Sequence, residues 1–186
     1  MGKIVVLSGS MRKKGNTDLL VRSFVDGASK NNEVEVISVA DYKVNPCVGC
    51  NSCFNREGNL CFQKDDMEII YKKLAKADMI VIASPVYFYG ISAELKAIID
   101  RLHTPLRNTF KVKKLGLLLV AAATLPAVFD AIILQYKLVL DFFKLEDAGK
   151  ICVYGVKEKG CLLYTSKEQK MMLLYLKTMK QLVLLL

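Results

Sequence analysis

Short apolar runs alternate with segments of helical periodicity along most of the chain. Runs rich in Val, Ile and Leu predict buried strands at residues 3–8, 33–39, 78–84, 114–123 and 149–156. Apolar side chains at three- and four-residue spacing predict helices between them, at residues 17–31, 65–77, 92–104 and 126–145. Strands that alternate with helices pair in parallel through right-handed crossovers. The pattern therefore predicts an α/β fold, a doubly wound five-stranded parallel sheet with helices on both faces.

We expect residues 1–186 to form a single domain, because their number suffices for one core and no linker divides them. The last five residues, "LVLLL", make the segment after residue 161 unusually apolar. We expect a helix from about residue 166 that packs on the sheet. A subunit contact or a lipid-surface helix is the alternative for this segment.

In a doubly wound sheet, ligands bind outside the carboxyl ends of the strands, at the point where the strand order reverses. The loops expected at this edge are 9–16, 40–64, 84–91 and 122–126.

The chain carries a net charge of +9 at pH 7, but its basic residues are scattered, and no block exceeds "RKK" at 12–14. The scatter argues against a nucleic-acid surface, and the charge fits equally well with attracting small phosphorylated ligands. The sequence contains no run of 18 apolar residues, the length needed to span a membrane, and the N-terminus lacks the apolar core of a signal peptide. We expect a cytoplasmic protein that binds neither nucleic acid nor a membrane.

The loop "SGSMRKKGNT" (8–17) connects the first strand to the first helix, where α/β proteins hold phosphate on a helix N-terminus. Its polar side chains could bind phosphate oxygens, and Arg12 adds a charged donor. Gly9 and Gly15 are one residue too far apart for a P-loop, and Asn16 stands in place of its Lys. A monophosphate is favoured over a nucleoside triphosphate, and an ordinary polar turn is the alternative.

The loop "SPVYFYGIS" (84–92) places Val86, Tyr87, Phe88 and Tyr89 at the same predicted edge. Exposed aromatic side chains there would suit a flat aromatic ligand. The alternative is that these rings pack on neighbouring helices.

Two motifs, "GSMRKKGNT" (9–17) and "SPVYFYGISAELKAIIDR" (84–101), resemble the NADPH-dependent FMN reductase family, which has a flavodoxin-like fold. The resemblance implies bound FMN, with NAD(P)H as the electron donor. It assigns the FMN phosphate to Ser8, Ser10, Arg12, Asn16 and Thr17. It implies that the isoalloxazine ring is lined by Pro85, Val86, Tyr87, Phe88 and Tyr89. The loop that contains Ala122 and Thr124 would contact the other edge of the flavin. We expect no catalytic side chain, because the flavin itself carries the hydride chemistry.

Four cysteines, Cys47, Cys50, Cys53 and Cys61, lie within "PCVGCNSCFNREGNLC" (46–61). Their C-x₂-C-x₂-C-x₇-C spacing is typical of cubane iron–sulfur ligation. It also resembles the iron–sulfur flavoprotein branch of the same family, in which such a motif holds a [4Fe–4S] cluster. Zinc, and free or redox-active thiols, remain alternatives. Because the loop follows the second strand, we expect the cysteines on the flavin side of the domain.

These features together predict an FMN-dependent oxidoreductase. It would pass electrons from NAD(P)H through FMN to an acceptor such as flavin, quinone or an iron–sulfur centre. The alternatives are a non-enzymatic electron carrier between partner proteins and a flavin-based redox sensor. The family resemblance further implies a homodimer or homotetramer.

Overall fold

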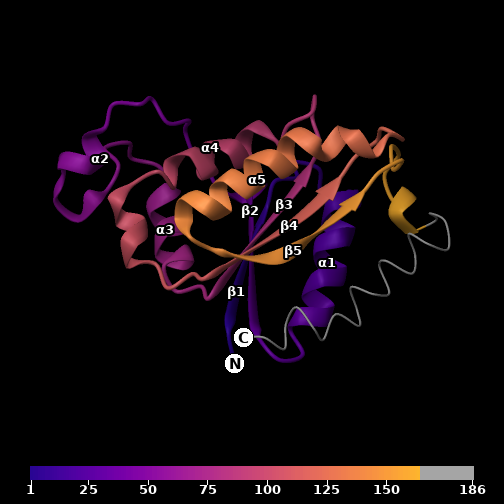
Figure 1. Ribbon diagram of the computed structural model, residues 1–186, viewed down its shortest axis with the longest axis horizontal. Coiled ribbons are helices and arrows are strands. Elements are labelled where there is room, and N and C mark those ends of the chain that lie inside the picture. Colours follow the sequence, from indigo (N-terminus) through magenta and orange to yellow (C-terminus); the bar gives the residue numbers. More distant parts are fainter. Residues whose placement is uncertain (164–186) are drawn as a thin grey trace.

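The sheet is five-stranded and parallel throughout, with the order β2-β1-β3-β4-β5 (Figure 1). The structure is a computed structural model, and it describes residues 1–163. The strands are β1 (Lys3–Ser8), β2 (Glu33–Ser38), β3 (Met79–Pro85), β4 (Lys114–Val120) and β5 (Glu146–Val153). The order reverses direction at β1, as in flavodoxin-like sheets, so the predicted fold is confirmed.

Helices cover both faces of the sheet, as predicted (Figure 1). Helix α1 packs on one face, and α3, α4 and α5 pack on the other. Alternate strand residues serve the two cores: Ile4 and Val6 face α1, whereas Val5 and Leu7 face the other layer. The bounds are α1 Asn16–Ala28, α3 Met67–Leu74, α4 Ala93–Arg101 and α5 Asp130–Phe143.

The structure differs from the predicted pattern mainly at element ends. The helix predicted from residue 126 begins as a 3₁₀ turn, Pro126–Phe129, and becomes α-helical at Asp130. Strand β5 begins at Glu146 rather than residue 149, because the backbone N–H of Glu146 already bonds to the Lys113 carbonyl at 2.8 Å. These first residues are polar, so apolar runs could not reveal them.

A short helix within the cysteine loop, α2 (Ser52–Asn55), was not predicted. The helix predicted from about residue 166 lies outside the described residues. Within residues 1–163, every helix is too short or too polar to cross a bilayer.

Candidate functional site

A cleft of about 100 Å³ opens where the carboxyl ends of the strands meet. Its walls come from the β1–α1 loop, the β3–α4 loop and the segments that follow β4 and β5. The lining residues are Ser10, Arg12, Gly15, Asn16, Thr17, Pro85, Val86, Tyr87, Val120, Ala122, Val156, Lys157 and Lys159.

Helix α1 presents its N-terminus to this cleft. Gly15 is the N-cap residue, and no side chain accepts a hydrogen bond from the first turn. The first N–H groups of a helix have no intrahelical partner, and the helix dipole gives this end a partial positive charge. The start of α1 therefore has the free N–H groups and the partial positive charge that suit an anion, as expected from the sequence.

The loop before α1 is held in shape by its own hydrogen bonds. The Ser10 hydroxyl accepts from the Arg12 backbone N–H at 3.2 Å and donates to the Arg12 carbonyl at 3.1 Å. Gly9 packs so tightly that an added Cβ would lie 2.7 Å from Leu95 and 2.8 Å from the Ser92 hydroxyl. The loop is thus seated directly on the start of α4.

Lys157 and Lys159 also line the cleft, and the sequence analysis did not identify them. The Asn16 side-chain amide positions their segment, because it donates to the carbonyls of Val156 (3.3 Å) and Glu158 (2.8 Å). Its oxygen accepts from the Leu162 backbone N–H at 3.3 Å. In this structure the Asn16 side chain therefore holds the chain after β5 beside α1. Since β5 ends at the same edge as the other strands, its following "VKEKG" could have been included in the expected site.

The β3–α4 loop turns sharply at two aromatic residues. Tyr87 and Gly90 exchange backbone hydrogen bonds of 2.9 and 3.0 Å, while Phe88 (φ 45°) and Tyr89 (φ 64°) are both left-handed. This type I′ geometry favours Asn and Gly, and each bulky residue there costs about 1–2 kcal/mol. Phe88 is 97% exposed and Tyr89 is 62% exposed. The rings do not pack on neighbouring helices, which was the alternative, and they form an exposed aromatic platform.

The predicted flavin residues are distributed unevenly around the cleft. Eight of them line it: Ser10, Arg12, Asn16, Thr17, Pro85, Val86, Tyr87 and Ala122. Ser8 is buried at the end of β1, and Phe88, Tyr89 and Thr124 are exposed beside the cleft without lining it.

The four clustered cysteines are free thiols in an open loop. Cys47 and Cys50 are exposed, and Cys53 and Cys61 are half-buried. The Cys50 thiol lies 3.2 Å from the Ser52 hydroxyl, and this hydrogen bond lowers the pKa of Cys50. Within residues 1–163, no three Cys, His, Asp or Glu side chains gather closely enough to hold a metal ion.

The cysteine loop does not lie beside this cleft, in contrast to the expectation from its place after β2. It runs back along α4 to the far end of that helix (Figure 1). There the Thr104 hydroxyl donates to the Asn59 carbonyl at 3.0 Å, and the Phe54 and His103 ring centres are 5.7 Å apart. The β3–α4 loop adjoins the start of α4, so the whole helix, roughly 13 Å long at 1.5 Å per residue, separates the cleft from the cysteine loop.

A buried ion pair closes the base of the cysteine loop. The Arg101 guanidinium pairs with Asp65, and the two side chains are only 2% and 3% exposed. Arg101 also donates to the Asn45 carbonyl at 3.2 Å, and the Asp65 carboxylate accepts from the Asn45 N–H at 2.9 Å. Burial opposes ionisation of Asp65, but hydrogen bonds from Arg101 and from backbone N–H groups outweigh it and lower its pKa.

His103 takes no part in the cleft. Its ring lies between Phe54 and Phe142, with ring centres 5.7 and 5.5 Å away. Cys152 differs from Cys50 in acidity, because burial raises the pKa of the Cys152 thiol to about 11.

The sequence matches known proteins over most of its described length. The family described as NADPH-dependent FMN reductase matches residues 2–146. An iron–sulfur flavoprotein of Methanocaldococcus jannaschii is 46% identical over 112 residues, which are 60% of this chain and 56% of that protein. One from Methanosarcina thermophila is 35% identical over 60% of this chain and 58% of its own length. The matched part of this chain thus spans just over half the length of these relatives.

Solved structures share the fold at low sequence identity. The NAD(P)H:quinone oxidoreductase from Methanothermobacter marburgensis superposes with a TM-score of 0.71 at 13% identity. The superposition covers 95% of this chain and 96% of that one. The likeness extends the fold assignment to the whole sheet.

Proposed function

Because this chain belongs to the NADPH-dependent FMN reductase family, we propose that it is an FMN-dependent oxidoreductase that takes electrons from NAD(P)H. The observation that carries the proposal is the cleft itself. It joins an uncapped helix N-terminus and three cationic side chains to an exposed aromatic loop. A ligand with a phosphate at one end and a flat ring system at the other would match the cationic half and the aromatic half of the cleft.

The residues present fit the phosphate of FMN. Arg12, Lys157 and Lys159 supply positive charge, and the first turn of α1 supplies N–H donors. Within residues 1–163, no acidic side chain lines the cleft to oppose a dianion. The cleft volume of about 100 Å³ suits the phosphate end of FMN. The ring system would then lie outside the cleft, against the exposed side chains of Tyr87, Phe88 and Tyr89.

Bound flavin would supply the redox chemistry, because it accepts a hydride from a reduced nicotinamide and can release electrons singly or in pairs. The side chains around the cleft bind and orient. Their charges attract phosphorylated ligands, and the left-handed turn keeps the aromatic residues exposed. Neither His nor a carboxylate lines the cleft, so we assign no acid or base among its residues.

We also propose that Cys47, Cys50, Cys53 and Cys61 hold a [4Fe–4S] cluster. Four thiols at this spacing have suitable donor chemistry, and two relatives are named iron–sulfur flavoproteins. Because the thiols are dispersed in this structure, binding would require the loop to close over its fixed base at Asp65 and Arg101. With a cluster, the chain could equally serve as an electron carrier between proteins.

We propose that the protein forms a homo-oligomer. The side chains of Leu134 and Leu138, one turn apart on the outer face of α5, are 59% and 60% exposed. Paired apolar side chains of this kind suit contact with a second copy of the chain. Light scattering of the purified protein, compared with Leu134→Glu, tests this directly.

Anaerobically purified protein should be assayed for NADH and NADPH oxidation with FMN bound, using a soluble quinone and free FMN as acceptors. Steady turnover that requires FMN supports the enzyme. Tight FMN binding without turnover would favour the carrier, and absence of FMN binding would contradict both.

The cluster is tested separately by iron and sulfide analysis. Cys50→Ser should remove the bound iron and leave FMN binding unchanged. Cys152→Ser, which changes a half-buried thiol outside the loop, is the matched control. Iron that survives Cys50→Ser, or no iron in the parent protein, would contradict the cluster without affecting the flavin proposal.

A further inference from the structure

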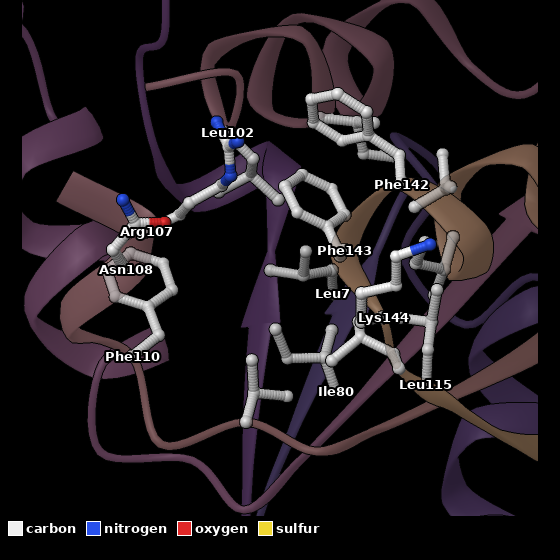
Figure 2. Close-up of a pocket in the computed structure, with 15 residues that line it drawn as sticks. Leu7, Ile80, Leu102, Arg107, Asn108, Phe110, Leu115, Phe142, Phe143 and Lys144 are labelled. Carbon is white, nitrogen blue, oxygen red and sulfur yellow. The ribbon is translucent and has the colours of Figure 1, made fainter. Parts of the chain in front are cut away.

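A second and larger cavity, of about 370 Å³, lies on the sheet face that carries α3, α4 and α5. Its floor includes Leu7, Ile80 and Leu115 from the strands (Figure 2). The segment after α4 forms one side, and the C-terminal end of α5 forms the other. It shares no lining residue with the flavin cleft.

The size of this cavity is unusual for a protein interior. Cores are packed as densely as organic crystals, and voids larger than a water molecule are few. Ligand pockets, by contrast, typically measure about 300–1,000 Å³ and have mostly apolar walls with a few placed polar groups. Leu7 and Leu115 are 0% and 3% exposed, so the cavity reaches the buried surface of the sheet. Its volume and its walls are those of a ligand site.

The polar groups around the cavity are two cations and an amide. Figure 2 shows Arg107 and Asn108 on one side and Lys144 on the other. None of the lining residues is acidic. In residues 1–163, neither Arg107 nor Lys144 forms an ion pair with a carboxylate.

Arg107 is held in place by aromatic rings rather than by an opposite charge. Its guanidinium carbon lies 4.8 Å from the ring centre of Phe142 and 5.3 Å from that of Phe143. One of its nitrogens donates to the Thr104 carbonyl at 3.2 Å. A guanidinium has five N–H donors, so several remain for a ligand.

Lys144 occupies the left-handed position at the C-terminal end of α5, where a residue with a long side chain is not expected. It follows α5 in the left-handed conformation, with φ 54° and ψ 44°. Gly or Asn usually takes this position, because a side chain there is strained. The chain nevertheless places a lysine at the cavity wall.

We propose that this cavity binds an amphiphilic organic anion, a carboxylate with an apolar body. The apolar part would fill the space above Ile80 and Leu115, and the carboxylate would lie between Arg107 and Lys144. The lining suits both halves of such a ligand: apolar walls surround its body, and unopposed positive charge faces its head.

Isothermal titration of the full-length, FMN-loaded protein with decanoate tests the proposal, and decanol serves as the uncharged probe of equal chain length. Saturable binding of one decanoate per chain is expected, at least about tenfold tighter than decanol. Arg107→Gln should weaken decanoate by about tenfold or more, the size of a lost charged hydrogen bond. Lys137→Gln, an exposed lysine on α5, should change nothing.

Val139→Phe would fill the cavity from α5, and it should abolish decanoate binding while FMN affinity stays unchanged. Several results would overturn the proposal. Any one of three results suffices: decanoate does not bind saturably, decanoate and decanol bind with equal affinity, or decanoate binding is unchanged in both Arg107→Gln and Val139→Phe. A change in oligomeric mass on Val139→Phe, without loss of decanoate binding, would assign the cavity to a contact between chains instead.

Discussion

The flavin cleft and the cysteine loop are built in opposite ways. The cleft is formed by short segments that leave adjacent strands, and its backbone is fixed by bonds such as Gly9 N–H to the Ala83 carbonyl at 2.7 Å. The cysteine loop is a long excursion held mainly at its base, by Asp65, Arg101 and the Asn45 backbone. Its four cysteine side chains are dispersed, whereas three cationic side chains already line the one cleft. In our proposal, the FMN site on the strand ends is preformed, and the cluster site on the long loop must be gathered by the cluster that it binds.

The largest effect should come from breaking the base of the cysteine loop. Arg101→Leu leaves the Asp65 carboxylate buried without its cationic partner and should lower the free energy of unfolding by about 3–5 kcal/mol. Urea unfolding measures the change. The exposed Lys72–Glu68 pair is the matched control, and Lys72→Ala should cost less than about 1 kcal/mol. Equal effects of the two variants would show that the Arg101–Asp65 pair contributes no more to the free energy of unfolding than an exposed ion pair does.

The next effect separates the two regions by charge. Lys157→Gln should weaken FMN binding by about 1–3 kcal/mol, because it removes a charged donor from the cleft. Fluorescence titration with FMN measures the loss. Lys64→Gln, an exposed lysine in the cysteine loop, should leave the affinity unchanged. If Lys64→Gln weakened FMN as much as Lys157→Gln, the attraction would be general rather than local.

The strained turn allows the platform to be tested against stability. Replacing Phe88 by Asn and Tyr89 by Gly installs the residues that a type I′ turn favours. The double variant should gain about 1–2 kcal/mol in free energy of unfolding, less than the summed strain of the two residues, because Gly also raises the entropy of the unfolded chain. It should bind FMN more weakly. A gain in stability with unchanged FMN affinity would mean that these rings do not contact the flavin.

The smallest effect concerns pH. The folded pKa of Asp65 is lowered, so its contribution to stability is present above its unfolded pKa of about 3.9 and is lost as the pH falls through the folded value. The stability difference between the parent and Asp65→Asn should therefore shrink below about pH 4. Urea midpoints at pH 7 and pH 3 measure it, and a difference that is equal at both would contradict the assignment.

The sequence predicted the five strands and their parallel pairing well, because buried parallel strands are apolar runs bounded by turns. It could not predict the polar start of β5, where backbone pairing overrides composition. Lys157 and Lys159 were missed because their place depends on the Asn16 side chain, a contact across 140 residues or more. The cysteine loop was placed on the wrong side because its path is set by Arg101 and Thr104, not by the strand that it leaves.

In our proposal, the start of α1 and the cations around it hold the phosphate of FMN. Parallel titrations with FMN and riboflavin, which differ only in that phosphate, test this most directly. We predict saturable binding of one FMN per chain, with riboflavin at least about tenfold weaker, and a smaller difference in affinity between the two in Arg12→Ala. Equal affinity for FMN and riboflavin in the parent protein would contradict it.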